Sequence, residues 1–318
     1  MTNQTLVEKK NSFSRYFLGF VLLVGVSLIF GSVFPVIKAV GNNLSPQLLT
    51  TSRYAIAALV LSPLVFKSSR SLIQDGSIIG LLCFSVSFLS CTALEGISAS
   101  RAGFTFALSI VFVTLWEIFS GRTLSVLTLI CTTMAFSGIV LMSWYSGESF
   151  TGSIWMILAA ILDSAYILII ERAVTIHSPL KLAAVSCWLP AILGLIWSAS
   201  ELTEKWGIVA DNIWALLYLG IVAIAIVTVM EIVAQQWVSG NETAIFRTIE
   251  PLSATFFSFW FLGETFHFYD YLGSGMVLGG IVLLLLFKDR GIKYSQFLKN
   301  LFIFRYSFPS PQSKQFNR

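Results

Sequence analysis

The residues of this sequence most able to do chemistry are charged side chains inside strongly apolar runs. The stretch NETAIFRTIEPLSATFFSFWFLGETF, residues 241–266, carries Arg247, Glu250 and Pro251 in its first turns. If the run crosses a lipid bilayer, a charge near the centre costs roughly 2.5–3.5 kcal/mol, so such side chains usually face protein or a wet cavity. Arg247 and Glu250 are three residues apart and can pair on one helix face. Three interpretations of these two charges are possible: a structural ion pair, part of a cavity wall, or an ion pair that also acts as a gate.

Pro251 predicts a bend at this charged face. Proline has no N–H, and its ring clashes with the carbonyl of the residue four positions back, which is Arg247. The bend would leave a backbone oxygen without a partner, which a membrane tolerates only where protein or water satisfies it. We therefore expect this segment to line a cavity.

Asp163 lies about ten residues into another apolar run, with apolar neighbours on each side. Because a lone carboxylate at that depth cannot reach water along its own side chain, we expect it to carry a proton or to contact a cation. A hydrogen bond to Ser or Tyr neighbours in another helix is the structural alternative. Tyr166, three residues later, is counted with Asp163 among the candidate residues.

Glu231, Gln235 and Trp237 form a third candidate group, two-thirds along an apolar run. Glu231 and Gln235 share nearly the same helix face. A carboxylate, an amide and an aromatic ring are what a small polar or cationic solute needs from a mostly apolar pocket. Hydrogen bonding between helices explains the amide equally well.

Small and kinking residues stand together in the first apolar run, as Gly31, Ser32, Phe34 and Pro35. When FGSVFPVIK is aligned with DSAYILIIE after a shift of 133 residues, they match residues 164–168. Close helix packing and contact with a substrate are both compatible with them. Arg53, near the end of the second run, is interpreted as a side chain that snorkels to the membrane surface.

Other chemistries find no matching pattern. The sequence has no GxxxxGK phosphate loop, no HExxH motif and only two histidines, so we expect no catalytic residues, metal or cofactor. The cysteines show no CxxC spacing and are interpreted as packing residues. They are Cys83, Cys91, Cys131 and Cys187.

The composition indicates which kind of secondary structure carries these candidate residues. Only 11% of the 318 residues are charged and 56% are hydrophobic, with a mean hydropathy of +0.82. A soluble domain carries about 25% charged residues, so this chain is an integral membrane protein. The apolar runs lack an alternation of period two, which predicts helices and an all-α fold. Ten such runs lie near 17–38, 47–66, 77–96, 102–119, 124–144, 153–172, 180–199, 212–237, 243–262 and 268–287.

Lysine and arginine placement predicts the orientation. With the N-terminus inside, most basic residues between runs face the cytoplasm, together with seven in the tail. Residues 1–16 are then a cytoplasmic N-terminal segment and 288–318 a basic cytoplasmic tail. The net charge of +4 is explained by this topology and by anionic membrane lipid, without nucleic acid.

The chain repeats itself. SASRAGFTFALSIVFVTLWEIFSGRTL aligns with GNETAIFRTIEPLSATFFSFWFLGETF after a shift of about 142 residues. This predicts two units, 17–144 and 153–287, of five transmembrane helices each. An odd number of spans inverts the second unit relative to the first, an arrangement typical of secondary transporters, which bind substrate near the midplane.

Four motifs in order carry a family resemblance: FGSVFPVIK, SPQLLTTSRYAIAALVL, EPLSATFFSFWFLGETF and GSGMVLGGIVLLL. Through them the chain resembles the drug/metabolite transporter superfamily, EamA group, over residues 17–287. The resemblance implies a ten-helix bundle that moves small organic solutes, often outward, through a central cavity. The first repeat departs from the pattern: it lacks the proline that the second has as Pro251, and Arg122 stands where the second repeat has Glu264.

These observations together predict a secondary active transporter, an exporter of a small organic metabolite across the plasma membrane, and not an enzyme. Its two units would rock around the cavity while Asp163, Glu231 or Glu250 exchanges a proton with substrate binding. The expected partners are a small-molecule substrate and membrane lipid, with a homodimer left open. A membrane-embedded sensor or scaffold without transport, or a membrane-embedded enzyme, is the alternative.

Overall fold

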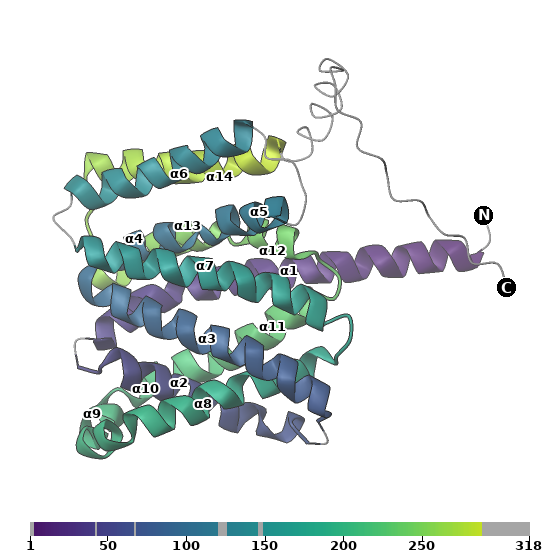
Figure 1. Ribbon diagram of the computed structural model, residues 1–318, viewed down its shortest axis with the longest axis horizontal. Helices are drawn as coiled ribbons and strands as arrows, with labels where there is room; N and C mark the ends of the chain where they lie inside the picture. The colour runs from purple at the N-terminus through teal and green to yellow at the C-terminus, as the bar shows by residue number, and fades with distance from the viewer. Residues whose placement is uncertain (1–2, 42, 67, 120–125, 146–148, 288–318) are drawn as a thin grey trace, which may run out of the picture.

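The computed structural model describes residues 3–41, 43–66, 68–119, 126–145 and 149–287. Within these ranges every regular element is helical, as the apolar runs predict. The predicted tail 288–318 and Arg122 lie outside the described residues. The predicted N-terminal segment is helical from Asn3 and continues into the first apolar run as one helix, α1, which extends beyond the other helices in Figure 1.

The helices alternate with short connections along the whole described chain. The first half contains α1 (Asn3–Gly41), α2 (Pro46–Leu61), η1 (Ser62–Leu64), α3 (Arg70–Gly96), α4 (Ala99–Phe106), α5 (Ser109–Phe119) and α6 (Val126–Tyr145). The second half contains α7 (Phe150–Ala173), α8 (Pro179–Glu204), α9 (Trp206–Asp211), α10 (Ile213–Leu217), the π-helix η2 (Tyr218–Ile226), α11 (Val227–Ala234), α12 (Gly240–Phe246), α13 (Ile249–Leu262) and α14 (Phe268–Phe287).

Six of the described helical segments are long and apolar enough to cross a membrane. Two shorter apolar helices, Leu129–Tyr145 and Phe268–Leu284, accompany them. These lengths agree with an all-helical membrane protein that crosses the bilayer several times. The six segments are Arg15–Gly41, Arg70–Gly96, Ala99–Trp116, Phe150–Ala173, Pro179–Glu204 and Ile213–Ala234.

The helix starts follow local sequence signals. Ser45 accepts a hydrogen bond from the Leu48 N–H at 3.2 Å, with Pro46 as the first residue of α2. Ser178 stands at the same place before α8, which begins at Pro179. Proline suits the first helical position because the N–H that it lacks has no partner there. The two SP pairs therefore begin helices.

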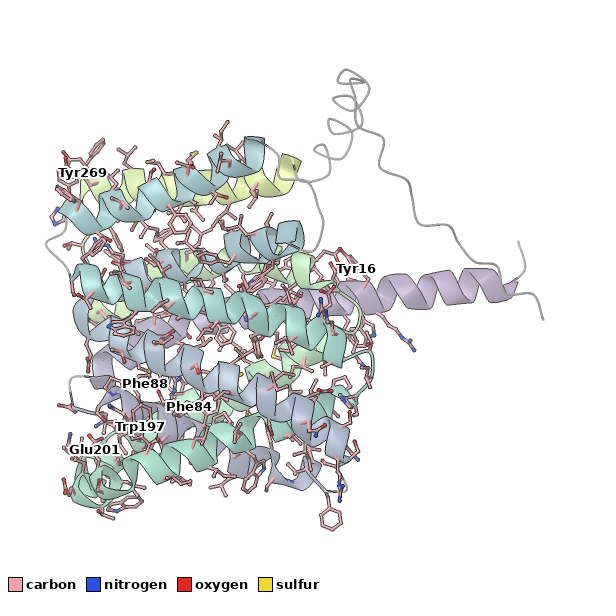
Figure 2. The ribbon with its side chains drawn as sticks, viewed as in Figure 1. Tyr16, Phe84, Phe88, Trp197, Glu201 and Tyr269 are labelled. Carbon is pink, nitrogen blue, oxygen red and sulfur yellow. The ribbon has the colours of Figure 1, made fainter. Side chains whose placement is uncertain are left out.

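Packing joins segments that lie far apart in the sequence. In Figure 1, α6 and α14 pair along one side of the molecule, while α2 and α8 lie at the opposite side. Trp197 of α8 packs against Phe84 and Phe88 of α3, with ring centroids 6.0 and 5.0 Å apart (Figure 2). The helices that hold the candidate residues, α1, α7, α11, α12 and α13, lie between these two sides.

Two predicted runs are each interrupted by a turn between two α-helices. Run 102–119 contains the junction between α4 and α5, and run 243–262 contains the junction between α12 and α13. Pro251 lies in the first turn of α13, where a missing N–H needs no partner, so it does not kink a continuous helix as predicted. The carbonyl of Arg247 accepts the Glu250 N–H at 3.1 Å and is not left without a partner. The first junction contains no proline at all.

Candidate functional site

A cavity of about 100 Å³ lies among α1, α2, α3, α7, η2 and the junction between α12 and α13. Its walls are mostly apolar and aromatic, and four charged side chains reach it: Arg53, Asp163, Arg247 and Glu250. A cavity of this volume has room for several water molecules. It is therefore a pocket in which a few polar groups sit on an apolar wall, as small-molecule sites usually are.

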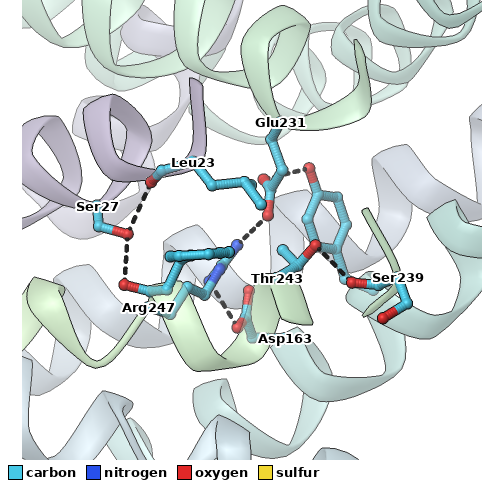
Figure 3. Close-up of polar contacts among 9 residues, drawn as sticks. Leu23, Ser27, Asp163, Glu231, Ser239, Thr243 and Arg247 are labelled. Atoms are coloured by element: carbon cyan, nitrogen blue, oxygen red, sulfur yellow. Dashed lines mark hydrogen bonds and ion pairs between the residues drawn. The ribbon is translucent and has the colours of Figure 1, made fainter. Parts of the chain in front are cut away.

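Arg247 is the centre of a buried ionic cluster (Figure 3). Its Nη1 donates to Asp163 Oδ2 at 2.7 Å and its Nη2 to Glu231 Oε1 at 2.6 Å. The Tyr166 hydroxyl donates to the other oxygen of Glu231 at 3.2 Å. The three charged side chains are at most 5% exposed. The guanidinium also lies 5.3 Å from the ring centroid of Phe30, within cation–π range.

This cluster corrects two predictions. Arg247 does not pair with Glu250, because the chain turns at Arg247 and Thr248 and the two residues do not share one helix face. Asp163 is not a lone carboxylate, since it holds the guanidinium of Arg247 from a helix 84 residues earlier in the chain. Its partner is a cation rather than the Ser or Tyr neighbour of the structural alternative.

The position of Arg247 depends on α1. The Ser27 hydroxyl lies 3.0 Å from the Phe246 carbonyl, at the point where α12 ends, and Ser253 of α13 donates to the Ser27 carbonyl at 3.1 Å. Gly31 lets the helices approach this closely, because a Cβ there would lie 2.7 Å from the Ala254 nitrogen. The contact from α1 thus holds the junction that aims Arg247 at its partners.

Glu250 and Arg53 reach the same cavity without a direct partner. Glu250 is 3% exposed and Arg53 is 4% exposed. Neither side chain makes a hydrogen bond or an ion pair with the described residues, and the Nε of Arg53 is buried without an acceptor. The prediction that Arg53 snorkels to the membrane surface was therefore wrong.

Other predicted residues separate into those at the cavity and those away from it. Phe34 lines the cavity, with its ring 5.9 Å from that of Phe106. Ser32 hydrogen-bonds the Tyr218 hydroxyl and faces another depression of the protein. Pro35 lies inside α1, which continues through it without interruption.

Gln235 and Trp237 do not line the cavity. Gln235 is buried, and its amide group has no partner among the described residues. Trp237 is half-buried beside Gly19, near the start of the first span. The predicted grouping of these two with Glu231 around a solute does not occur in this conformation.

Sequence reasoning missed Arg53 and the aromatic wall of Phe30, Tyr54 and Phe106. The signal for Arg53 was a charged residue within an apolar run, but its side chain was expected to reach the membrane surface rather than a cavity. The aromatic residues carried no signal, because a phenylalanine that faces lipid and one that faces a cavity have the same sequence environment.

Polar clusters lie at the two ends of the segment formed by α12 and α13. After α13, Glu264 accepts from the N–H groups of Ala99 and Ser100 at 2.7 and 3.1 Å, and thereby caps α4. Beside it, Arg101 pairs with Asp270 at 2.9 Å. This cluster joins the start of α4 to the connection between α13 and α14.

Before α12, Glu242 accepts from the N–H and the hydroxyl of Ser239 at 2.9 and 2.8 Å and from the Tyr16 hydroxyl at 2.8 Å. Partial burial alone would raise the pKa of Glu242, but the hydrogen bonds from Ser239 and Tyr16 outweigh it and lower the pKa below its ordinary value. Figure 2 shows Tyr16 and Tyr269, the residue before Asp270, at opposite ends of the packed helices, so the two clusters lie at opposite ends of the helix bundle.

Comparison with known proteins decides the family. The model of the EamA-like transporter family matches residues 17–144 and 150–286. The chain belongs to the EamA-like transporter family. This confirms the resemblance to the drug/metabolite transporters and makes the chain a membrane transporter that crosses the bilayer several times. Family membership indicates a transporter rather than an enzyme.

Relatives of this EamA protein agree with that assignment. Two proteins of Archaeoglobus fulgidus named uncharacterized transporters are 27% and 25% identical to it, over 81% and 83% of this chain and 82% and 96% of their own. One solved crystal structure matches with a TM-score of 0.61 at 17% identity, over 87% of this chain and 98% of the other. That likeness concerns the fold alone.

Proposed function

We propose that this EamA family protein is a secondary active exporter of a small organic metabolite across the plasma membrane. The observation that carries the proposal is the buried cluster of Asp163, Arg247 and Glu231 at the wall of a central cavity. Buried charges are costly, and inside a membrane they usually mark the path of a solute or an ion. No phosphate-binding loop supplies energy from ATP, so an ion or solute gradient is the proposed source.

The proposed architecture has ten spans in two inverted units of five, 17–144 and 153–287, with both termini in the cytoplasm. Support comes from the broken segments: α4–α5 and α12–α13 are interrupted close to the same place in the aligned repeats. Interrupted helices near the midplane are typical of the substrate sites of secondary transporters. The distribution of Lys and Arg supports the orientation.

Alternating access then requires that the two end clusters open in turn. One consists of Glu264 with the start of α4 and of Arg101 with Asp270. The other consists of Glu242 with Tyr16. Each holds its end of the molecule through a few charge-assisted hydrogen bonds, which can break without disrupting an apolar core.

Glu250 is the proposed proton carrier. The carboxylates of Asp163 and Glu231 are each held in an ion pair with Arg247. Glu250 lines the cavity without such a partner, so its carboxylate can take up and release a proton as the solute leaves and enters. Of the three carboxylates that the sequence offers as proton carriers, we therefore propose only this one.

The test compares metabolites inside and outside cells that express the wild type or Glu250→Gln at equal membrane levels. The flux of the exported solute is then measured with purified protein in liposomes, under an imposed proton gradient. Glu201→Gln is the control, because Glu201 contacts Ser45 and Lys205 outside the cavity.

We expect the proton gradient to drive the solute through the wild type and the control. Glu250→Gln should still exchange solute down its own gradient but lose the response to protons. The coupling would be refuted if the wild-type solute flux did not depend on the proton gradient. It would also be refuted if the flux through Glu250→Gln depended on the gradient as the wild-type flux does. Absence of any solute flux would refute transport by this cavity.

A further inference from the structure

The guanidinium of Arg53 is a buried cation for which the described residues provide no partner. It projects from the middle of α2 into the central cavity and is 4% exposed. The other arginine of the cavity, Arg247, has two carboxylates within 2.7 Å. Two arginines at one cavity thus differ completely in how their charge is balanced.

An unbalanced buried cation has a physical consequence. Taking a charge out of water costs several kcal/mol unless a counter-charge and hydrogen bonds compensate it. An arginine cannot lose its proton in a protein, so Arg53 must meet an anion or water in the cavity. Glu250 lines the same cavity but lies beyond ion-pair distance, which leaves the donors of Arg53 available to a solute.

We infer that Arg53 is the subsite that binds the carboxylate of the transported solute, an inference that rests on the proposed transport function. The planar guanidinium presents parallel N–H donors that match the two oxygens of a carboxylate. The aromatic wall of Phe30, Tyr54 and Phe106 covers the apolar body of the solute. The substrate class is therefore a small monocarboxylate with an apolar body.

The charge balance of the cavity favours a carboxylate over a phosphate. Two cations, Arg53 and Arg247, stand against three carboxylates, Asp163, Glu231 and Glu250. A doubly charged phosphate would increase the negative excess by two charges, whereas a carboxylate that faces Arg53 increases it by only one. Glu250 offers a place for an ammonium group, so the carboxylate belongs either to a plain acid or to a zwitterion.

The first experiment measures the charge preference of the cavity without any transport. Cys83 lines the cavity, and alanine replaces the three other cysteines, which are buried. Cys83 is then labelled with an anionic ethylsulfonate methanethiosulfonate and with a cationic ethyltrimethylammonium methanethiosulfonate. The ratio of the two rates is compared for proteins with Arg53, Arg53→Lys and Arg53→Gln.

We expect the anionic reagent to be favoured where Arg53 or the lysine is present, and the ratio to fall at least about tenfold in Arg53→Gln. Arg172→Gln is the control, because Arg172 is an arginine at the exposed end of α7, away from the cavity and from the two end clusters. It should leave the ratio unchanged. An unchanged ratio in Arg53→Gln would overturn the inference, as would an equal fall in Arg172→Gln.

The second experiment identifies the solute. Proteoliposomes are incubated with the small-molecule fraction of a cell lysate, and the solutes that accumulate with the wild type are identified by mass spectrometry. We expect them to carry a carboxylate, and we expect Arg53→Gln to slow their uptake at least about tenfold while Arg53→Lys retains part of it. Solutes without a carboxylate, or equal uptake by Arg53→Gln, would overturn the inference.

The same uptake measurement distinguishes a plain acid from a zwitterion as the solute. It also distinguishes a failure of the proposed transport function from a failure of the proposed role of Arg53. Zwitterionic solutes should be slowed by Glu250→Gln as well, whereas the uptake of plain acids down their own gradient should not. If no solute accumulates with the wild type, the transport function fails, and the labelling ratio of Cys83 still decides whether Arg53 makes the cavity an anion site.

Discussion

Removal of Arg247 is the perturbation with the largest expected effect on stability. Arg247→Met leaves Asp163 and Glu231, both at most 5% exposed, without the cation that now pairs with each of them. The two carboxylates then repel each other in a site that water barely reaches. Removing one partner of a buried ion pair costs about 3–5 kcal/mol, because the remaining charge is left uncompensated.

The triple variant Asp163→Asn, Glu231→Gln, Arg247→Met separates lost attraction from uncompensated charge. Replacing a whole buried ionic cluster with neutral groups of similar volume is often nearly neutral in free energy. We therefore expect the triple variant to recover most of the stability that Arg247→Met loses. The control is Arg172→Met at the exposed end of α7, which should change the free energy by at most about 0.5 kcal/mol.

The assay is thermal unfolding of the purified proteins in one detergent, followed by a fluorescence change. With about 2 °C per kcal/mol for a chain of this length, Arg247→Met should melt about 6–10 °C below the wild type. A melting temperature within about 2 °C of the wild type would refute the reasoning. So would a triple variant that is no more stable than Arg247→Met.

Three further predictions concern packing and the end clusters. Gly31→Ala should cost about 1–3 kcal/mol, because its Cβ would overlap α13, whereas Gly275→Ala, with nothing within 4 Å, should not lower the melting temperature. Glu264→Gln weakens the cap of α4 and should cost about 1 kcal/mol, seen as faster hydrogen exchange at its first turn; unchanged exchange would contradict the cap. Because its folded pKa is lowered, Glu242 contributes stability above about pH 4.3 that is lost as pH falls through the folded value. Thermal unfolding between pH 7 and pH 3 should show this loss, and Ser239→Ala should reduce it.

Most of the helical architecture could be predicted from the sequence. Every predicted apolar run is helical over most of its described length, because its residues have no alternation of period two and its backbone groups must pair within the segment. The SP pairs at residues 45–46 and 178–179 mark helix starts through purely local chemistry. The broken segment near Arg247 was also visible from its charges and its proline, although proline was assigned the wrong mechanical role.

The sequence by itself determined the class of the protein, the apolar segments, the family and the identity of the charges that the membrane cannot leave exposed. Only the tertiary structure decided which of those charges meet. Arg247 pairs with Asp163 and Glu231 rather than with its neighbour Glu250, because the turn between α12 and α13 and the contact with α1 set its direction. Arg53 faces the cavity for the same reason: a side chain's depth in one helix can be estimated from sequence, but what it faces depends on the helices packed around it.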